Sequence, residues 1–167
     1  GDRVCAESHD AAGLGEIAAR FARKPVLWDN YPVNDGARGS NFLRIDAFRG
    51  RGSELAGLTQ AHFVNPMNQC WLSRIALQSL ALLYQQGPAY DADAAFAYCL
   101  RAQCEEALAA QLAADLDALQ REGLSALSGA RLAQMRARYA EFHSPLAEEV
   151  RDWLHGGYAF DPACLTD

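Results

Sequence analysis

Short apolar runs and longer apolar stripes alternate in the first half of the chain. Residues 10–22 place apolar side chains on one helical face after Asp10, a common helix cap, so we expect a helix there. Residues 25–28 and 61–64 are apolar runs too short for a helix, and each predicts a strand, the first buried on both faces. Arg3–Ala6 is a weaker strand candidate.

Two further helical patterns separate and follow these strands. Ser53 is the expected cap of a short helix to about residue 60, and a strongly apolar helix is expected over residues 68–85. Strands that alternate with helices favour a parallel sheet. Residues 29–52 form a polar loop far longer than the usual connection, and such loops are mostly functional or disordered.

The second half of the chain is helical almost throughout. Gly87-Pro88 interrupts the pattern, so we predict an α/β domain over residues 1–88 and a helical bundle over 89–167. A break near Cys104 or Glu105 would split the first long helix into two. The apolar stripes of the bundle are Phe96 to Leu119, Leu132 to Phe142, and Leu146 to Leu154.

Composition narrows the choice of partners. The 167 residues are 50% hydrophobic and carry a net charge of −6, which disfavours nucleic acid and anionic membranes, and no apolar run is long enough to span a bilayer. The five cysteines contain no Cys-x-x-Cys pair and the four histidines no i,i+4 pair, so we expect no metal site. We expect a soluble protein. Its compartment stays open, because the N-terminus is expected to be truncated.

The polar segment from Trp28 to Asp35 follows directly after a predicted buried strand. An aromatic ring, amides and carboxylates at the carboxyl end of a parallel strand suit a sugar, whose hydroxyls need acceptors and whose apolar face packs on a ring. Asn65, at the end of the next strand, would bring another amide to the same edge. The same residues are also good turn formers, so an ordinary turn is the competing interpretation.

Three separated motifs make the chain recognisable. They are Pro25–Asp35, which reads PVLWDNYPVND, Arg49–Leu55, which reads RGRGSEL, and Asn65–Asn68 with Ile75–Leu77. In this order and spacing they closely resemble glycoside hydrolase family 84, the β-N-acetylglucosaminidases that include the O-GlcNAcases. The resemblance covers residues 1–88 well and the helical remainder by architecture. Arg44–Ala47 departs from it, because the family usually has a Leu-Gly-Pro turn there, which leaves the path of loop 36–52 open.

The resemblance implies a TIM barrel followed by a helical domain, with no cofactor. The implied reaction removes terminal β-linked N-acetylglucosamine with retention, and the acetamido oxygen of the substrate acts as nucleophile, an exception to the two-carboxylate scheme. The implied partner is a glycan or glycoprotein that contains N-acetylglucosamine. Its aglycone, whether protein, hyaluronan fragment or chitin-like oligomer, stays open.

The family's pocket residues can be carried over to four positions. Trp28 resembles a wall of the pocket that holds the acetamido methyl, and Asn30 the amide that supports that pocket. Asp35 resembles the acceptor for the 4- and 6-hydroxyls, and Asn65 the amide that meets the 3- or 4-hydroxyl. The family's two adjacent catalytic aspartates have no counterpart, because the sequence contains no Asp-Asp pair. We therefore expect no catalytic residue in this chain and the aspartate pair upstream of it.

The expected fold is thus α/β and then all-α: the last two or three βα units of a (β/α)₈ barrel, followed by a helical bundle. A barrel typically needs about 250 residues, so the chain is expected to be a fragment. A non-catalytic sugar-binding module and a helical interaction module are the alternatives. Among the other polar and aromatic residues, Asp29 and His62 are expected to be structural, and Trp71 and Trp153 are expected to pack in the core or between domains.

Overall fold

The computed structural model describes residues 4–164, and its sheet consists of two strands. β1 (Val26–Asp29) and β2 (Ala61–Val64) run parallel, with Val26 beside Ala61 and Asp29 beside Val64. Both strands lie where the sequence predicts them. The third candidate, Arg3–Ala6, is wrong for its described part, because Val4 and Cys5 form a turn and Ala6 is irregular; Arg3 lies outside the described residues.

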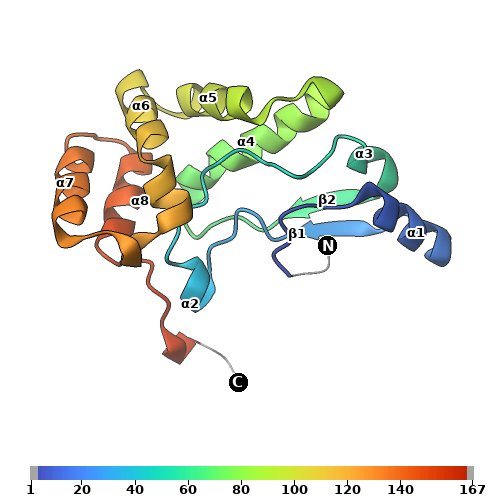
Figure 1. The fold of residues 1–167 in the computed structure, drawn as a ribbon, viewed down its shortest axis with the longest axis horizontal. Helices are drawn as coiled ribbons and strands as arrows, with labels where there is room; N and C mark the ends of the chain where they lie inside the picture. Colours follow the sequence, from blue (N-terminus) through green and yellow to red (C-terminus); the bar gives the residue numbers. More distant parts are fainter. Residues whose placement is uncertain (1–3, 165–167) are drawn as a thin grey trace.

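Only one face of this sheet is covered. Leu27 and Asp29 point to the covered side and are 7% and 1% exposed, whereas Val26 and Trp28 are 55% and 62% exposed. On β2 the side chain of Phe63 is also exposed and lies beside Trp28, with 6.5 Å between the ring centroids. The prediction that β1 is buried on both faces is therefore wrong, because the helices pack on one side of it alone (Figure 1).

Local signals set most helix bounds around the sheet. The Asp10 carboxylate accepts hydrogen bonds from the backbone N–H groups of Ala12 and Gly13, which confirms it as the cap of α1 (Ala11–Phe21). The predicted Ser53 cap is wrong: α3 (Leu55–Leu58) begins one residue later, after Glu54, and no side chain caps it. The helix expected at 68–85 is α4 (Cys70–Gln86), which begins beside α8 (Pro145–Leu154) and runs back along the strands (Figure 1).

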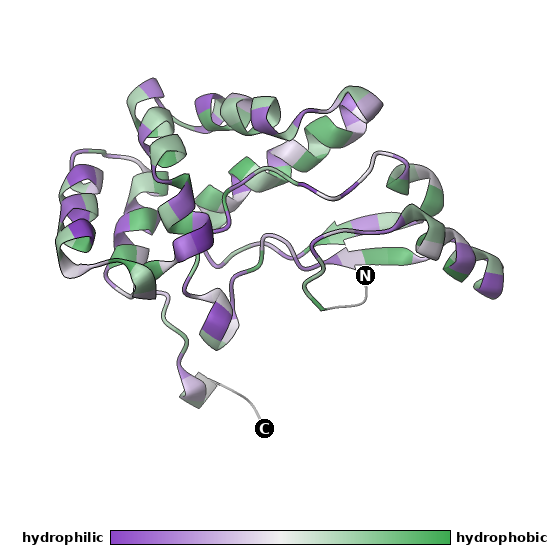
Figure 2. Ribbon diagram, viewed as in Figure 1, coloured by the Kyte–Doolittle hydropathy of each residue, from purple (hydrophilic) through white to green (hydrophobic). Residues whose placement is uncertain are grey.

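The second half forms a set of short packed helices. Cys104 is extended, with φ −151°, and splits the first long apolar stripe into two helices as expected. Hydrophobic and hydrophilic residues interleave along α7, which matches its predicted stripe (Figure 2). The remaining elements are α2 (Gly36–Gly39), η1 (Gly87–Ala89), α5 (Ala92–Gln103), α6 (Glu106–Ala114), the π-helical turn η2 (Ala118–Glu122), η3 (Leu124–Ala126), α7 (Gly129–Ala140), α8 (Pro145–Leu154) and η4 (Pro162–Cys164).

One large apolar core joins the long loop to the helices. Leu43 and Ile45 of the loop are fully buried and belong to the same cluster as Trp153 of α8. The Trp153 indole N–H donates to the backbone oxygen of Ser40 at 3.1 Å, which ties α8 to the loop. Core residues thus come from both sides of residue 88, and the predicted domain boundary there stays a prediction.

The helical region also contains one exposed tryptophan. Trp71, in the first turn of α4, is 40% exposed, so the core alternative of its prediction is wrong and the domain-packing alternative stays a prediction. The Arg74 guanidinium lies 5.1 Å from the centroid of its ring, on the outer side of the helix. No helix within residues 4–164 has both the length and the apolar character that a membrane span requires. The structure is mostly helical, with a small two-stranded parallel sheet.

Candidate functional site

The carboxyl ends of β1 and β2 bring three of the four predicted site residues together. The Asn30 side-chain oxygen accepts hydrogen bonds from the Trp28 indole N–H at 3.1 Å and from the Asn65 amide at 3.2 Å. The Asn30 amide in turn donates to the backbone oxygen of Val4 at 2.9 Å. Parallel pairing explains this meeting, because it places the ends of both strands at one edge of the sheet. We call Trp28, Asn30 and Asn65 the strand-end cluster.

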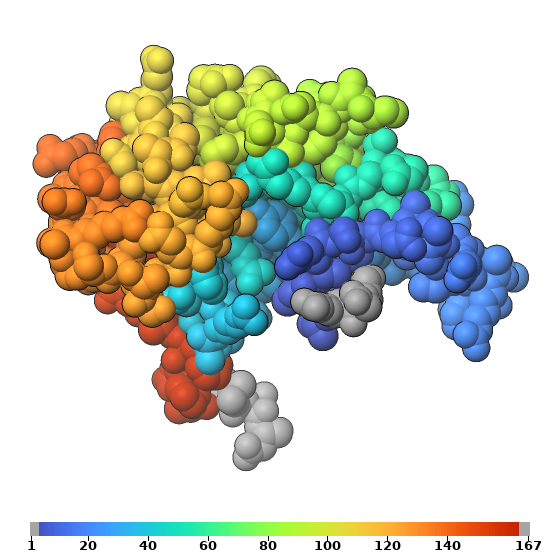
Figure 3. All heavy atoms as spheres, in the orientation of Figure 1, coloured from blue at the N-terminus to red at the C-terminus, as the bar shows by residue number. Residues whose placement is uncertain are grey.

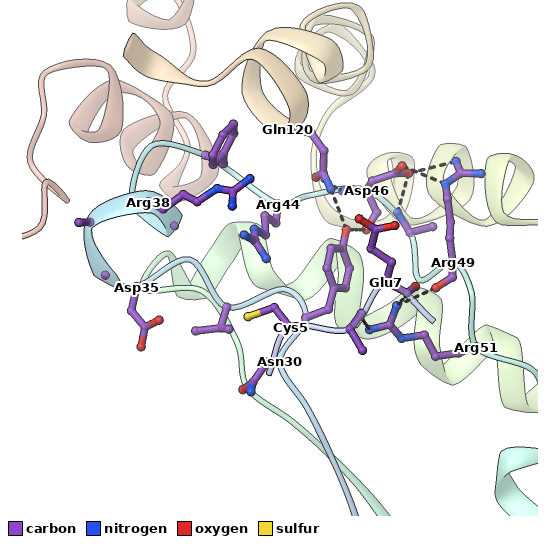
Figure 4. Close-up of a pocket in the computed structure, with 18 residues that line it drawn as sticks. Cys5, Glu7, Asn30, Asp35, Arg38, Arg44, Asp46, Arg49, Arg51 and Gln120 are labelled. Carbon is purple, nitrogen blue, oxygen red and sulfur yellow. Dashed lines mark hydrogen bonds and ion pairs between the residues drawn. The ribbon is translucent and has the colours of Figure 1, made fainter. Parts of the chain in front are cut away.

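The fourth residue, Asp35, stands apart from the strand-end cluster. It lies at the N-cap position of α2, is exposed, and makes no capping hydrogen bond. Its carboxylate points away from the Arg38 guanidinium (Figure 4). Its neighbour Asn34 is buried and structural: the Asn34 amide donates to Phe42 and Gln69, which holds the loop in place. The loop therefore serves as a turn at Asn34 and leaves the acceptor oxygens of Asp35 open.

A cavity of about 770 Å³ lies beside these residues. Its walls come from residues 5–7, residues 30–39, the loop at 42–51, and Gln120 of η2. Asn30 and Asp35 line it, whereas Trp28 and Asn65 lie outside its lining. Figure 3 shows a notch between the N-terminal segment in dark blue and the α2 segment in lighter blue, two segments that contribute to opposite walls. The size falls within the usual range of small-molecule sites.

A buried charge cluster holds the end of β1 below the cavity. Arg51 donates to both carboxylate oxygens of Asp29, at 2.8 and 2.6 Å, and also to the backbone oxygens of Ala6 and Glu7. His62 lies 3.1 Å from the same carboxylate. Burial by itself would raise the pKa of Asp29, but the hydrogen bonds from Arg51 and His62 hold it well below its usual range. Asp29 is therefore a charged structural acceptor, as expected from the sequence.

Gln120 is the residue through which the helical region lines the cavity. Gln120 accepts a hydrogen bond from the backbone N–H of Asp46 at 3.1 Å and donates to the Tyr31 hydroxyl at 3.3 Å. Tyr31 in turn donates to the backbone oxygen of Asp46 at 2.7 Å, and burial raises its pKa. π-helical turns such as η2 occur often at functional sites. Gln120 thus fixes two walls of the cavity against each other.

Sequence reasoning assigned no role to Arg51 or Gln120. Arg51 lies in the RGRGSEL motif, but nothing in that motif identifies Asp29 as its partner. Gln120 is separated from Tyr31 by 89 residues, and nothing in its local sequence distinguishes it from an ordinary helix-surface residue. Within the described part of the chain, no three His, Cys, Asp or Glu side chains gather in a way that could hold a metal ion.

The comparison with protein families decides the identity. The model of the beta-N-acetylglucosaminidase family, NAGidase, matches residues 1–117. The chain belongs to this family. The β-N-acetylglucosaminidases are glycoside hydrolases, so the recognition from the three motifs is confirmed at the family level. No curated protein matches the chain.

Solved structures share the fold of this β-N-acetylglucosaminidase chain over most of its length, including the helical region. An O-GlcNAc hydrolase mutant from Thermobaculum terrenum is similar with a TM-score of 0.69 and 22% identity, over 93% of this chain and 40% of that one. The structure of CpGH84B is similar with a TM-score of 0.60 and 15% identity, over 93% of this chain and 33% of that one. At these identities the likeness concerns the fold. The chain spans well under half the length of either protein.

Proposed function

We propose that this chain supplies the sugar-binding edge of a retaining, substrate-assisted β-N-acetylglucosaminidase that removes terminal β-linked N-acetylglucosamine. The observation that carries the proposal is the strand-end cluster. Its tryptophan ring is exposed, yet the Asn30 oxygen fixes the orientation of the indole. A fixed, exposed ring beside amide side chains suits the apolar face and the hydroxyls of a pyranose.

The open face of the sheet supports the barrel part of this proposal. In a (β/α)₈ barrel the helices cover the outside of the strands, and the inner face meets other strands. β1 and β2 have helices on one face, and Val26, Trp28 and Phe63 exposed on the other. We infer that this open face is the inside of a barrel whose remaining strands come from protein outside these 167 residues.

Each of the four residues then has a binding role. The Trp28 ring forms a wall for the acetamido methyl, and Asn30 holds that ring by accepting its N–H. Asn65 meets the 3- or 4-hydroxyl. Asp35 accepts hydrogen bonds from the 4- and 6-hydroxyls, for which its exposed carboxylate offers up to four lone-pair sites.

Catalysis in this proposal is divided between two parts of one enzyme. The acetamido oxygen of the substrate attacks the anomeric carbon, and an aspartate pair handles the proton transfers. The 167 residues contain no Asp-Asp pair, so these steps belong to the other part. This chain binds and orients the sugar, and its wall at Trp28 keeps the acetamido group near its reacting geometry.

Sugar binding by the 167-residue chain tests the proposal directly. We expect saturable binding of N-acetylglucosamine by calorimetry and no turnover of a fluorogenic N-acetylglucosaminide. Asp35→Asn should weaken binding about tenfold or more, because it removes hydrogen bonds to a charged acceptor worth about 1.5 to 3 kcal/mol each. Asp152→Asn, an exposed aspartate on α8, is the matched control. Absence of N-acetylglucosamine binding, or equal affinities of the two variants, would contradict the proposed sugar site.

A further inference from the structure

Four arginines line the cavity beside Asp35, and they differ in their partners. Arg49 pairs with Asp46 at 3.0 Å and with Asp93 at 2.6 Å, and Arg51 pairs with Asp29 at 2.6 Å. Arg38 and Arg44 line the same cavity, but neither makes an ion pair or a side-chain hydrogen bond with any residue between 4 and 164. The cavity therefore holds two guanidinium groups whose charge the described protein leaves uncompensated.

These two arginines line one cavity. Arg38 comes from α2 and Arg44 from the long loop, and Figure 4 shows both side chains pointing into the space between them. Arg38 is exposed and Arg44 is half-buried. Two like charges that line one partly enclosed cavity repel, and an oxyanion that reached both would replace that repulsion with charge-assisted hydrogen bonds.

The remaining acids of the cavity do not serve as that oxyanion. Asp46 is occupied by Arg49 and by the backbone N–H of Ala47. Glu7 lines the cavity without an ion pair to any described residue, and the Asp35 carboxylate points away from Arg38. An external anion therefore fits the pair best.

We propose that Arg38 and Arg44 bind an anionic group of the glycan whose N-acetylglucosamine occupies the strand-end cluster and Asp35. The group is a sugar-borne oxyanion, either the carboxylate of a uronic acid or a sulfate or phosphate ester. One cavity is lined by Asn30 and Asp35 as well as by both arginines, so one ligand can reach all four. This inference rests on the proposed function, and it narrows the substrate class to acidic glycans.

The test compares neutral and anionic ligands of similar size on the 167-residue chain. The probes are N,N′-diacetylchitobiose, an N-acetylglucosamine–glucuronate disaccharide, a chitobiose sulfated on its second sugar so that the terminal hydroxyls stay free, and inorganic sulfate, each titrated by calorimetry at low and high salt. We expect at least one anionic glycan to bind about tenfold or more tightly than chitobiose, with a preference that shrinks as salt rises. The anionic glycan that binds most tightly shows whether the group recognised by the two arginines is a carboxylate or a sulfate ester.

Variants then assign the preference to the two arginines. Arg38→Gln and Arg44→Gln should each bring the ratio of anionic to neutral affinity close to one, whereas Arg101→Gln, an exposed arginine on α5, should keep the wild-type ratio. Thermal melting checks that all three variants fold. Chitobiose and the anionic glycans binding equally to the wild type would overturn this inference and leave the sugar site standing. No binding of any glycan would overturn the proposed function, and this inference with it.

Discussion

The helical region and the sheet edge use the same residue type in opposite ways. Trp153 of α8 is 1% exposed and packs in the large core, whereas Trp28 of β1 is 62% exposed and is held by a hydrogen bond to Asn30. In the helical region the apolar stripes bury one another. At the sheet edge the apolar side chains lie on an open face, and polar side chains gather where the strands end. The difference shows that the helical region contributes much of the large buried core, whereas the sheet edge keeps large apolar side chains exposed.

The paired and unpaired arginines repeat this contrast within one cavity. Arg51 is buried and makes hydrogen bonds that join the N-terminal segment to β1. Arg38 and Arg44 contribute charge without a described partner. The first kind of arginine holds the wall, and the second is available for a ligand.

The two tryptophans should give the largest difference in stability. Trp153→Ala removes a fully buried ring from the core and should lower the free energy of unfolding by about 3 to 5 kcal/mol. Trp28→Ala should change it by less than about 1 kcal/mol, because most of that ring is already in water. Urea unfolding followed by circular dichroism measures both. Similar losses in the two variants would show that the sheet face is covered in solution.

The second comparison is between the buried Arg51 and the more exposed Arg49. Arg51→Met leaves the buried Asp29 charge without its main partner, so we expect a loss of about 3 kcal/mol or more in the free energy of unfolding. Arg49→Met should cost less, about 1 to 2 kcal/mol, because Arg49 is 46% exposed, Asp93 is largely in water, and the buried Asp46 carboxylate keeps its hydrogen bond from the backbone N–H of Ala47. A small effect at Arg51 would contradict its role in holding the end of β1.

Gln120 tests the link between the helical region and the cavity. Gln120→Leu leaves the backbone N–H of Asp46 and the Tyr31 hydroxyl without this partner, so we expect a loss of about 1 to 3 kcal/mol. Gln134→Leu, at an exposed position of α7, is the control and should change stability by less than about 0.5 kcal/mol. Equal stabilities of the two variants would mean that the helices do not support the cavity.

The smallest expected effect is a pH dependence from His9. Its side chain is 5% exposed, and burial lowers its pKa although Asp29, 3.3 Å away, acts in the opposite direction. The unfolded chain therefore binds more protons than the folded one below pH of about 6.5, and stability should fall as the pH drops through that value. His9→Asn should flatten this slope in unfolding curves between pH 7.5 and about 5.5. His143→Asn, at an exposed position, should leave the slope unchanged.

The sequence by itself determined the local elements. The apolar run at 61–64 gives β2 at those bounds, Asp10 caps α1, and the stripe from Phe96 breaks at Cys104. These features depend on the periodicity of neighbouring residues and on side chains that bond to their own backbone, both of which can be read over a few positions. The sequence also predicted that Asn65 lies at the same edge as Asn30, because parallel pairing brings the carboxyl ends of the two strands together. The sugar-binding roles of Trp28, Asn30, Asp35 and Asn65 stay predictions.

Only the tertiary structure decided what each element faces. The apolar run of β1 predicted two buried faces, but whether a face is covered depends on which helices pack there, and Trp28 remained exposed. The partner of Arg51 lies 22 residues away and that of Gln120 lies 89 away, so no local pattern points to either. The residue type alone does not tell an exposed arginine from a buried one. Their roles separate only when packing brings a carboxylate to one guanidinium and leaves another facing a cavity.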